Sequence, residues 1–237
     1  MTGTDTKGDK QADTQANIQA QMMDRLAETA WTQLAETAPR QLHIDDIAVA
    51  AGVSPAAARA VSGSITALIL HRLAAFDRQA VLESLADIED AGEVTIREKI
   101  VEALMRRFEV YAPFRQQIAQ LDRAARRDPA LGLRLLDSLA QAMRMMLRMA
   151  GDDLDGLAGE ARVRGVALVA MQVARVWKDD TAPDLSATLK EIDVRLARAE
   201  EWGRTMRVLR DHNPAAHPDG HEHDDEAGLP GAGDRYQ

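Results

Sequence analysis

One short segment, Ile44 to Pro55 (IDDIAVAAGVSP), constrains the fold of this chain more than any other. An apolar-periodic stretch ends there at Gly52, and a glycine suits a tight turn because it has no Cβ. Ser54 and Pro55 have the residue types of a helix N-cap and a first helical position. The segment therefore predicts two short helices, over residues 44–51 and 54–61, joined as a helix-turn-helix.

Helical periodicity runs through most of the remaining chain. Apolar spacing and turn residues predict further helices over residues 16–37, 64–88, 95–110, 114–126, 130–150, 160–178 and 184–210. Aromatic residues make up only 3% of the chain, although hydrophobic residues reach 46%, which favours an all-α protein over a sheet protein. We expect a disordered arm (1–16), a three- to four-helix helix-turn-helix domain (17–90), a helical domain (91–210) and a disordered tail (211–237).

Several classes of function are disfavoured by what the sequence lacks. There are no cysteines, which excludes disulfides, thiolate catalysis and cysteine metal sites. No apolar run approaches the length of a transmembrane helix, and the polar N-terminus has no signal core, so we expect a cytoplasmic protein. Neither a Ser-His-Asp arrangement nor a phosphate-binding glycine loop is recognisable. The sequence therefore predicts a protein that is not an enzyme and has no cofactor.

The tail carries most of the charge imbalance. The formal net charge is −9, and from residue 211 onward seven acids accompany one arginine. Histidines alternate there with carboxylates, a combination that chelates transition metals weakly. Because such a segment has no core to fix a ligand geometry, we expect a disordered tail and no metal site at His212, His217, His221 and His223.

With this layout, the chain resembles the tetracycline-repressor (TetR) family over about residues 18–205. Residues 47–54 (IAVAAGVS) match the family's usual IAxxAGVS. In the C-terminal half, residues 104–108, 112–113, 175–177 and 180–185 resemble a bacterial subgroup of such regulators. The resemblance implies an N-terminal DNA-binding domain, a larger C-terminal domain for effector binding and dimerisation, and a homodimer on a palindromic site.

The stretch after the motif departs from the family pattern. Members usually place a tyrosine and a Ser-Lys pair there, whose hydroxyl and ammonium groups bind phosphates. Here residues 58–65 contain one cation, Arg59, and acids outnumber bases eight to five between residues 21 and 87. Duplex binding depends on cations that replace counterions, so we expect it to be weak. The DNA contacts implied by the resemblance are Arg40, Ser54, Ala56, Ala57, Arg59 and Thr66.

A second branch of the fold offers an alternative function. The alanine-rich run of residues 55–60 also resembles the ubiquinone-biosynthesis lipid-binding family, which keeps the repressor fold but binds lipid and a partner enzyme instead of DNA. That family has a Trp-Tyr motif at the start of its penultimate helix, whereas residues 161–165 here contain no aromatic residue. Two hypotheses stay open: a ligand-modulated regulator, and a non-enzymatic lipid-binding accessory protein that has lost DNA binding.

The C-terminal half contains a methionine-rich set of apolar residues. Methionine is flexible and polarizable, so these residues suit either a cavity for an apolar small ligand or lipid, or a core that is poor in aromatics. The candidate pocket residues are Met105, Phe108, Met143, Met146, Leu147 and Met171.

The last two long helices each carry an apolar stripe. In the resembled family these helices pack across a two-fold axis as a four-helix bundle, and small residues let helices approach closely. Burial within one chain would explain the same stripes. The candidate dimer-interface residues are Ala167, Ala170, Ala174, Trp177, Leu185, Leu189, Ile192 and Leu196.

Overall fold

The computed structural model describes the backbone of residues 5–205 and the side chains of residues 13–204. Within this part of the chain all regular structure is helical, as predicted. The acidic tail, with its histidines, lies outside the described residues. The helices are α1 (Asp5–Gln33), η1 (Pro39–Gln41), α2 (Ile44–Ala50), α3 (Pro55–Val61), α4 (Ile65–Ala91), α5 (Ile96–Tyr111), η2 (Ala112–Phe114), α6 (Arg115–Ala125), α7 (Pro129–Ala150), α8 (Gly156–Trp177) and α9 (Ser186–Thr205).

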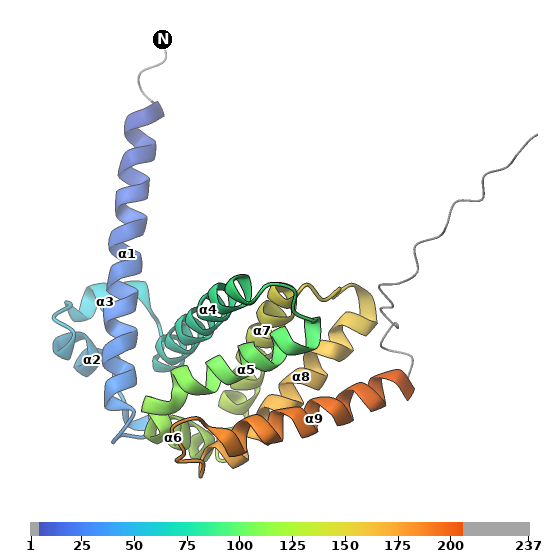
Figure 1. Cartoon of the computed structure of the whole chain (residues 1–237). Coiled ribbons are helices and arrows are strands. Elements are labelled where there is room, and N and C mark those ends of the chain that lie inside the picture. Colours follow the sequence, from blue (N-terminus) through green and yellow to red (C-terminus); the bar gives the residue numbers. More distant parts are fainter. Residues whose placement is uncertain (1–4, 206–237) are drawn as a thin grey trace, which may run out of the picture.

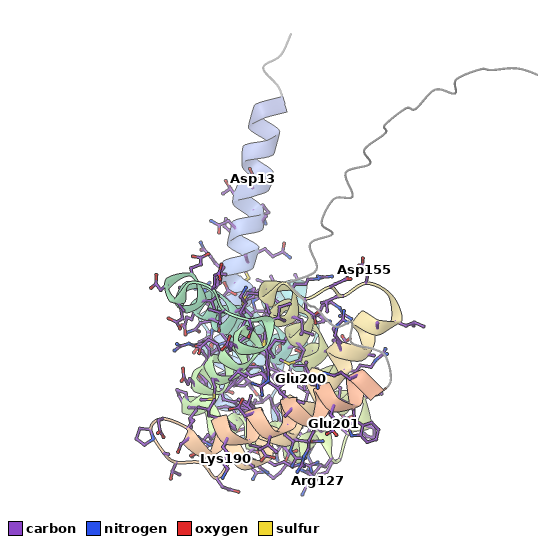
Figure 2. The ribbon with its side chains drawn as sticks, turned by 45° about the vertical axis from the view of Figure 1, so that its right-hand side comes forward. Asp13, Arg127, Asp155, Lys190, Glu200 and Glu201 are labelled. Carbon is purple, nitrogen blue, oxygen red and sulfur yellow. The ribbon has the colours of Figure 1, made fainter. Side chains whose placement is uncertain are left out.

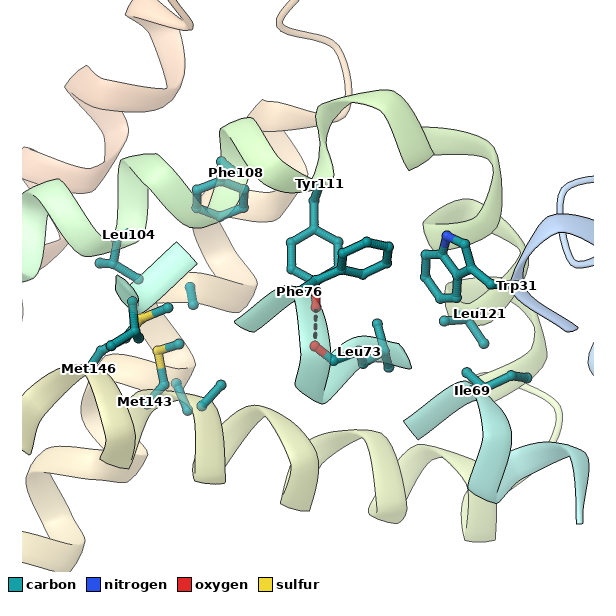
Figure 3. Close-up of a cluster of buried hydrophobic side chains, with 14 of the residues drawn as sticks. Trp31, Ile69, Leu73, Phe76, Leu104, Phe108, Tyr111, Leu121, Met143 and Met146 are labelled. Atoms are coloured by element: carbon teal, nitrogen blue, oxygen red, sulfur yellow. Dashed lines mark hydrogen bonds between the residues drawn. The ribbon is translucent and has the colours of Figure 1, made fainter. Parts of the chain in front are cut away.

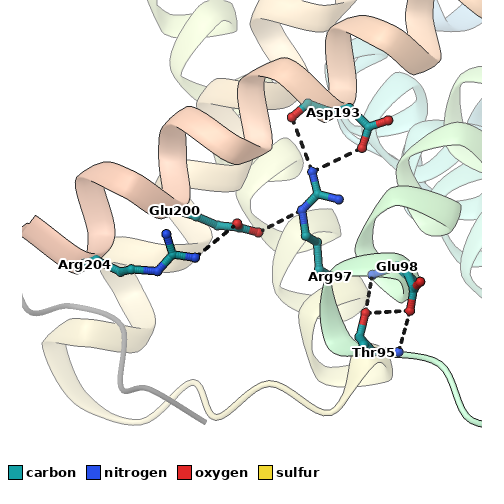
Figure 4. Close-up of polar contacts among 6 residues, drawn as sticks. All are labelled: Thr95, Arg97, Glu98, Asp193, Glu200 and Arg204. Atoms are coloured by element: carbon teal, nitrogen blue, oxygen red, sulfur yellow. Dashed lines mark hydrogen bonds and ion pairs between the residues drawn. The ribbon is translucent and has the colours of Figure 1, made fainter. Parts of the chain in front are cut away.

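Local capping signals explain why the helices start where they do. The hydroxyl of Ser54 accepts the Ala57 N–H at 3.2 Å, and that of Ser64 caps α4 in the same way. Thr95 and Glu98 form a capping box at the start of α5 (Figure 4). Hydrogen bonds from the Thr95 side chain and backbone hold the pKa of Glu98 below its ordinary value.

The first helix corrects one expectation. We predicted a disordered arm over residues 1–16, but α1 begins at Asp5. Its N-terminal half projects beyond α2 and α3, and residues 13–20 are exposed (Figure 1). Helix propagation costs far less than nucleation, so a helix fixed by its buried C-terminal half extends through polar residues that bury nothing.

Helix α4 packs against helices of both the N-terminal and the C-terminal part of the chain. The first part of α4 packs against α1, while the rest packs against α5 and α7; α8 and α9 form a second closely packed pair (Figure 1). Buried apolar side chains from α1 through α9 form one contiguous cluster. The two parts on either side of residue 90 are therefore joined by a common core.

The few aromatic residues gather where these two parts meet. Trp31 of α1 lies edge-on to Phe76 of α4 at 5.3 Å, and Phe114 stacks on Phe76 at 4.7 Å. Tyr111 completes the group, whereas Met143 and Met146 lie at the other end of the same core (Figure 3). Aromatic pairs bury large areas in fixed geometries, which stiffens the junction.

Charged side chains cover the outside of this core. Asp13 on the projecting part of α1 and Lys190 and Glu201 on α9 are exposed (Figure 2). No helix in the described part of the chain is long and apolar enough to cross a membrane. No cluster of three or more His, Asp or Glu side chains among the described residues could hold a metal ion.

Candidate DNA-binding surface and ligand cavity

The predicted helix-turn-helix is present in the structure. Gly52 makes the turn with a φ of +66°, a conformation that favours glycine. Ile47 and Ala48 of α2 and Ala58 of α3 are completely buried, so the two short helices pack against α1 and against each other. The opposite sides of α2 and α3 are exposed.

The residues predicted to contact DNA differ in their exposure to solvent. Arg40, Ser54, Ala56 and Arg59 are exposed, and Thr66 is half-buried in the first turn of α4. Ala57 instead packs against the hydrophobic core. A 3.6-residue period places Ala57 and the buried Ala58 on the inner side of α3, which removes Ala57 from the surface that could face a duplex.

Two arginines and one histidine of this region contact carboxylates. Arg59 forms an ion pair with Asp45 of α2, although both side chains remain more than half exposed. Arg72 of α4 lies 2.5 Å from Glu28 of α1. His71 Nε2 lies 2.7 Å from Asp24 Oδ1. These contacts tie the helices together and engage both Arg59 and Arg72.

A cavity of about 480 Å³ opens in the C-terminal part. Its wall comes from α4, α5, α6, α7 and α8. The size lies within the range typical of small-molecule sites. Most of the lining is apolar and includes Phe108, Leu121, Leu135, Leu139, Met171 and Trp177.

A buried polar cluster interrupts this apolar wall. Asp77 Oδ1 accepts the Arg107 Nε–H at 2.8 Å and lies 3.1 Å from the Tyr111 hydroxyl, which is also 3.2 Å from the Leu73 carbonyl (Figure 3). Burial and the Asp77 carboxylate raise the pKa of Tyr111 well above its usual value. Burial acts to lower the pKa of Arg107, but the charge of Asp77, the interaction with Tyr111 and the hydrogen bonds to both together outweigh it, and the pKa is raised. A neutral phenol and an Asp–Arg ion pair therefore face the cavity.

Only two predicted pocket residues line the cavity, Phe108 and Met171. The other four, Met105, Met143, Met146 and Leu147, are buried in the core and do not line it. Methionine composition signals packing as readily as a ligand site. Asp77 was not among the residues predicted for this site. An acid within the apolar stripe Leu73, Phe76 and Ala80 of α4 indicates a polar site inside the core.

The predicted dimer-interface residues mostly face inward. Ile192 and Leu196 of α9 are 0% and 5% exposed because α9 packs on α8 within the same chain. Ala170, Ala174 and Trp177 line the cavity, and Ala167 and Leu185 are buried. Of the predicted set, Leu189 alone belongs to the exposed side of the pair. Leu168 and Met171 of α8 and Val194 of α9 are also exposed apolar side chains.

Helix α6 lies between the cavity and the helix-turn-helix. Ile118, Leu121 and Ala125 of α6 line the cavity, and α6 also contacts η1, which directly precedes α2. Its first residue, Arg115, donates to the backbone carbonyls of Trp177 and Asp180 at the end of α8. One short helix thus touches the cavity, the end of α8 and the segment that directly precedes the helix-turn-helix.

Comparisons with known proteins agree on the fold. No protein-family model and no curated protein matches the chain. The solved TetR transcriptional regulator from Nitrosomonas europaea ATCC 19718 aligns with a TM-score of 0.59 at 16% identity, covering 76% of this chain and 98% of that one. A tetR-family transcriptional regulator from Streptomyces coelicolor aligns with a TM-score of 0.50 at 20% identity, covering 83% and 91%. The chain therefore has the all-α fold of the TetR-family transcriptional regulators.

Proposed function

We propose that this protein is a dimeric transcription regulator whose DNA affinity is modulated by an apolar small ligand in the C-terminal cavity. The helix-turn-helix reads DNA through the exposed side of α3 and the start of α4. Arg59 and Arg40 provide phosphate contacts, with Ala56 and Thr66 near the bases and Ser54 fixing the start of α3. Both structural neighbours are described as TetR-type transcriptional regulators.

One observation carries the regulatory part of the proposal: α6 lines the cavity and also contacts η1. A ligand that fills the cavity presses on α6 and so displaces η1 and α2. It shifts the protein toward the conformation that it binds better, in proportion to its difference in affinity for the two. In a dimer such a shift changes the spacing of the two reading helices relative to successive major grooves.

The dimer forms through the exposed sides of α8 and α9. A two-fold axis brings the same surface of each copy together, so the exposed apolar residues of the two copies meet. Leu168, Met171, Leu189 and Val194 supply the apolar part of this surface.

A selection of bound fragments from random duplex DNA, at low and at physiological salt, tests DNA binding. We expect a palindromic motif whose affinity falls steeply with salt, because phosphate contacts dominate affinity. Recovery of no motif at either salt concentration would rule out a DNA-reading function.

A specific observation favours the lipid-binding accessory protein as a second candidate. Arg59 and Arg72 are both engaged by carboxylates, so the region that should attract DNA is largely neutralised. Native mass spectrometry of the freshly purified protein separates the two functions. A co-purified quinone or phospholipid, together with failure of the DNA selection, would favour the lipid binder.

A further inference from the structure

We propose that the cavity takes an uncharged, largely apolar molecule bearing a hydrogen-bond acceptor such as a carbonyl oxygen, and that Arg107 donates to this acceptor. The inference rests on the proposed function, because it specifies the ligand of the same cavity. The hydrogen bonds of the buried cluster and the charges on the cavity wall support it.

The Arg107 guanidinium has more N–H donors than its protein partners use. Its Nε–H is used by Asp77, and Tyr111 is a second hydrogen-bond partner of the side chain; a guanidinium has five N–H donors, so these two partners do not use them all. The Arg107 side chain is 15% exposed. The side chain lines the cavity and its guanidinium lies over the Tyr111 ring at 4.6 Å, which holds it in place. A fixed guanidinium with free N–H groups is a preorganised site for a ligand oxygen.

The charge balance of the wall selects against ions. The charged residues that line the cavity are two carboxylates and two arginines: Asp77 with Arg107, and Asp122 with Arg126. Each pair is already neutral. A bound carboxylate would lie near the buried Asp77 without a cation of its own, and a bound ammonium would meet Arg107. An uncompensated charge in a buried site is costly, whereas a neutral carbonyl adds none.

The apolar part of the cavity wall determines the chemistry of the rest of the ligand. Ile118, Leu121, Leu135, Leu139, Phe108 and Trp177 present hydrocarbon on several sides of the polar cluster. An apolar chain or ring system gains from burial there, in proportion to the area that leaves water. The ligand is therefore an apolar body with one neutral polar group.

Three probes of similar length and different charge test this inference: 2-undecanone, decanoic acid and decylamine. Each is titrated by calorimetry at pH 7.5 into the full-length protein. We expect 2-undecanone to bind about tenfold or more tightly than either ion. Tighter binding of the acid or the amine overturns the inference but keeps the cavity as the ligand site of the proposed regulator.

Substitutions test whether Arg107 donates the hydrogen bond to the ligand. The double variant Asp77→Asn/Arg107→Met removes both charges together and leaves no buried ion unpaired. It should lose about tenfold in affinity for 2-undecanone, provided that its circular dichroism matches the wild type. The double variant Asp87→Asn/Arg106→Met, at a second ion pair between α4 and α5 that does not line the cavity, is the matched control and should bind like the wild type. Equal affinities of the double variant and the wild type would refute the role of Arg107.

Absence of binding by all three probes overturns the inference and with it the ligand part of the proposed function. The DNA selection, performed on the same preparation, still decides whether the protein is a DNA-binding regulator.

Discussion

At the scale of single residues, Arg59 is the critical position for the proposed DNA binding. It is the one cation of α3, and Asp45 engages it from α2 across the turn. An exposed ion pair contributes only about 0.2–1 kcal/mol. Phosphates can therefore compete for Arg59, at a cost in affinity.

Replacing Asp45 by Asn should strengthen binding to duplex DNA, because it frees Arg59 for phosphate. At low salt we expect the affinity for duplex DNA to rise by about two- to fivefold more than the change in net charge alone would cause. This factor corresponds to the free energy of an exposed ion pair. Asp46→Asn is the matched control, because Asp46 is exposed in the same first turn and its replacement removes the same charge. Fluorescence anisotropy with a labelled duplex measures both. Equal affinities of the two variants would assign the effect to net charge alone.

Asp180 is a buried carboxylate at the connection between α8 and α9. Its Oδ2 accepts the Thr188 hydroxyl at 2.7 Å and the Thr188 N–H at 2.8 Å. Burial acts to raise the pKa of Asp180, but these hydrogen bonds, that from Ala182 and the charge of Arg115 lower it below its ordinary value of about 3.9. An acid whose pKa is lowered on folding stabilises the protein above its unfolded pKa, and this stabilisation is lost as the pH falls through the folded pKa.

Asp180→Asn should therefore lower the free energy of unfolding at pH 7 by about 2 kcal/mol, since hydrogen bonds to charged groups contribute about 1.5–3 kcal/mol. The difference from the wild type should begin to shrink below about pH 4, where the carboxyl of the unfolded chain becomes protonated, and should be lost as the pH falls through the lower pKa of the folded carboxyl. Urea unfolding across this pH range provides the measurement. Asp179→Asn is the control, because Asp179 is the neighbouring residue and is exposed. A difference that stays constant with pH would contradict the assignment.

At the scale of elements, the start of α8 depends on a close backbone approach. A Cβ at Gly159 would overlap the backbone of Leu154, in the connection that leads from α7 to α8. At Gly165, in the middle of α8, a Cβ would meet no atom within 4 Å. The same substitution should therefore have opposite effects at the two glycines.

Gly159→Ala should destabilise the protein by about 1–3 kcal/mol, the usual cost of forcing an extra carbon into a packed site. Gly165→Ala should stabilise it by about 0.5–1 kcal/mol, because alanine loses less conformational freedom in a helix. Thermal or urea unfolding of the two variants checks both signs. Destabilisation by both to the same extent would mean that the approach of Leu154 is not the cause.

The polar links of α9 act at the same scale. Arg97 of α5 lies between Asp193 and Glu200 of α9, and Arg204 pairs with Glu200 (Figure 4). The pairs are part-exposed, so each contributes little on its own. They orient α9 along α5, and the apolar residues beneath supply most of the stability.

At the scale of the whole molecule, the exposed side of α8 is the surface that we assign to dimerisation. Leu168→Glu places a charge there, and Leu168 is 51% exposed in the single chain, so the fold should tolerate it. We expect the variant to be a monomer by analytical ultracentrifugation where the wild type is a dimer, because an unpaired charge disfavours a buried interface. Leu133→Glu on α7, where the leucine is 68% exposed, should leave the wild-type mass unchanged. A dimeric Leu168→Glu variant would move the interface elsewhere.

The sequence by itself determined the helices and the helix-turn-helix. Their signals are local: the apolar period, the caps at Ser54, Ser64 and Thr95, and the turn at Gly52. Such signals act over one or two helical turns and need no knowledge of the partner. Residues 5–16 were the exception, because their helix extends from a buried segment further along the chain.

Only the tertiary structure decided what each apolar face meets. A stripe on a helix predicts that the face is buried, but not whether a neighbouring helix, a second copy or a cavity covers it. Ile192 and Leu196 meet α8, Met143 and Met146 fill the core, and the cavity forms beside Asp77. The pairing of Arg59 with Asp45 likewise depends on how α2 and α3 pack. Contacts between distant residues depend on packing angles and side-chain volumes, which no short stretch of sequence contains.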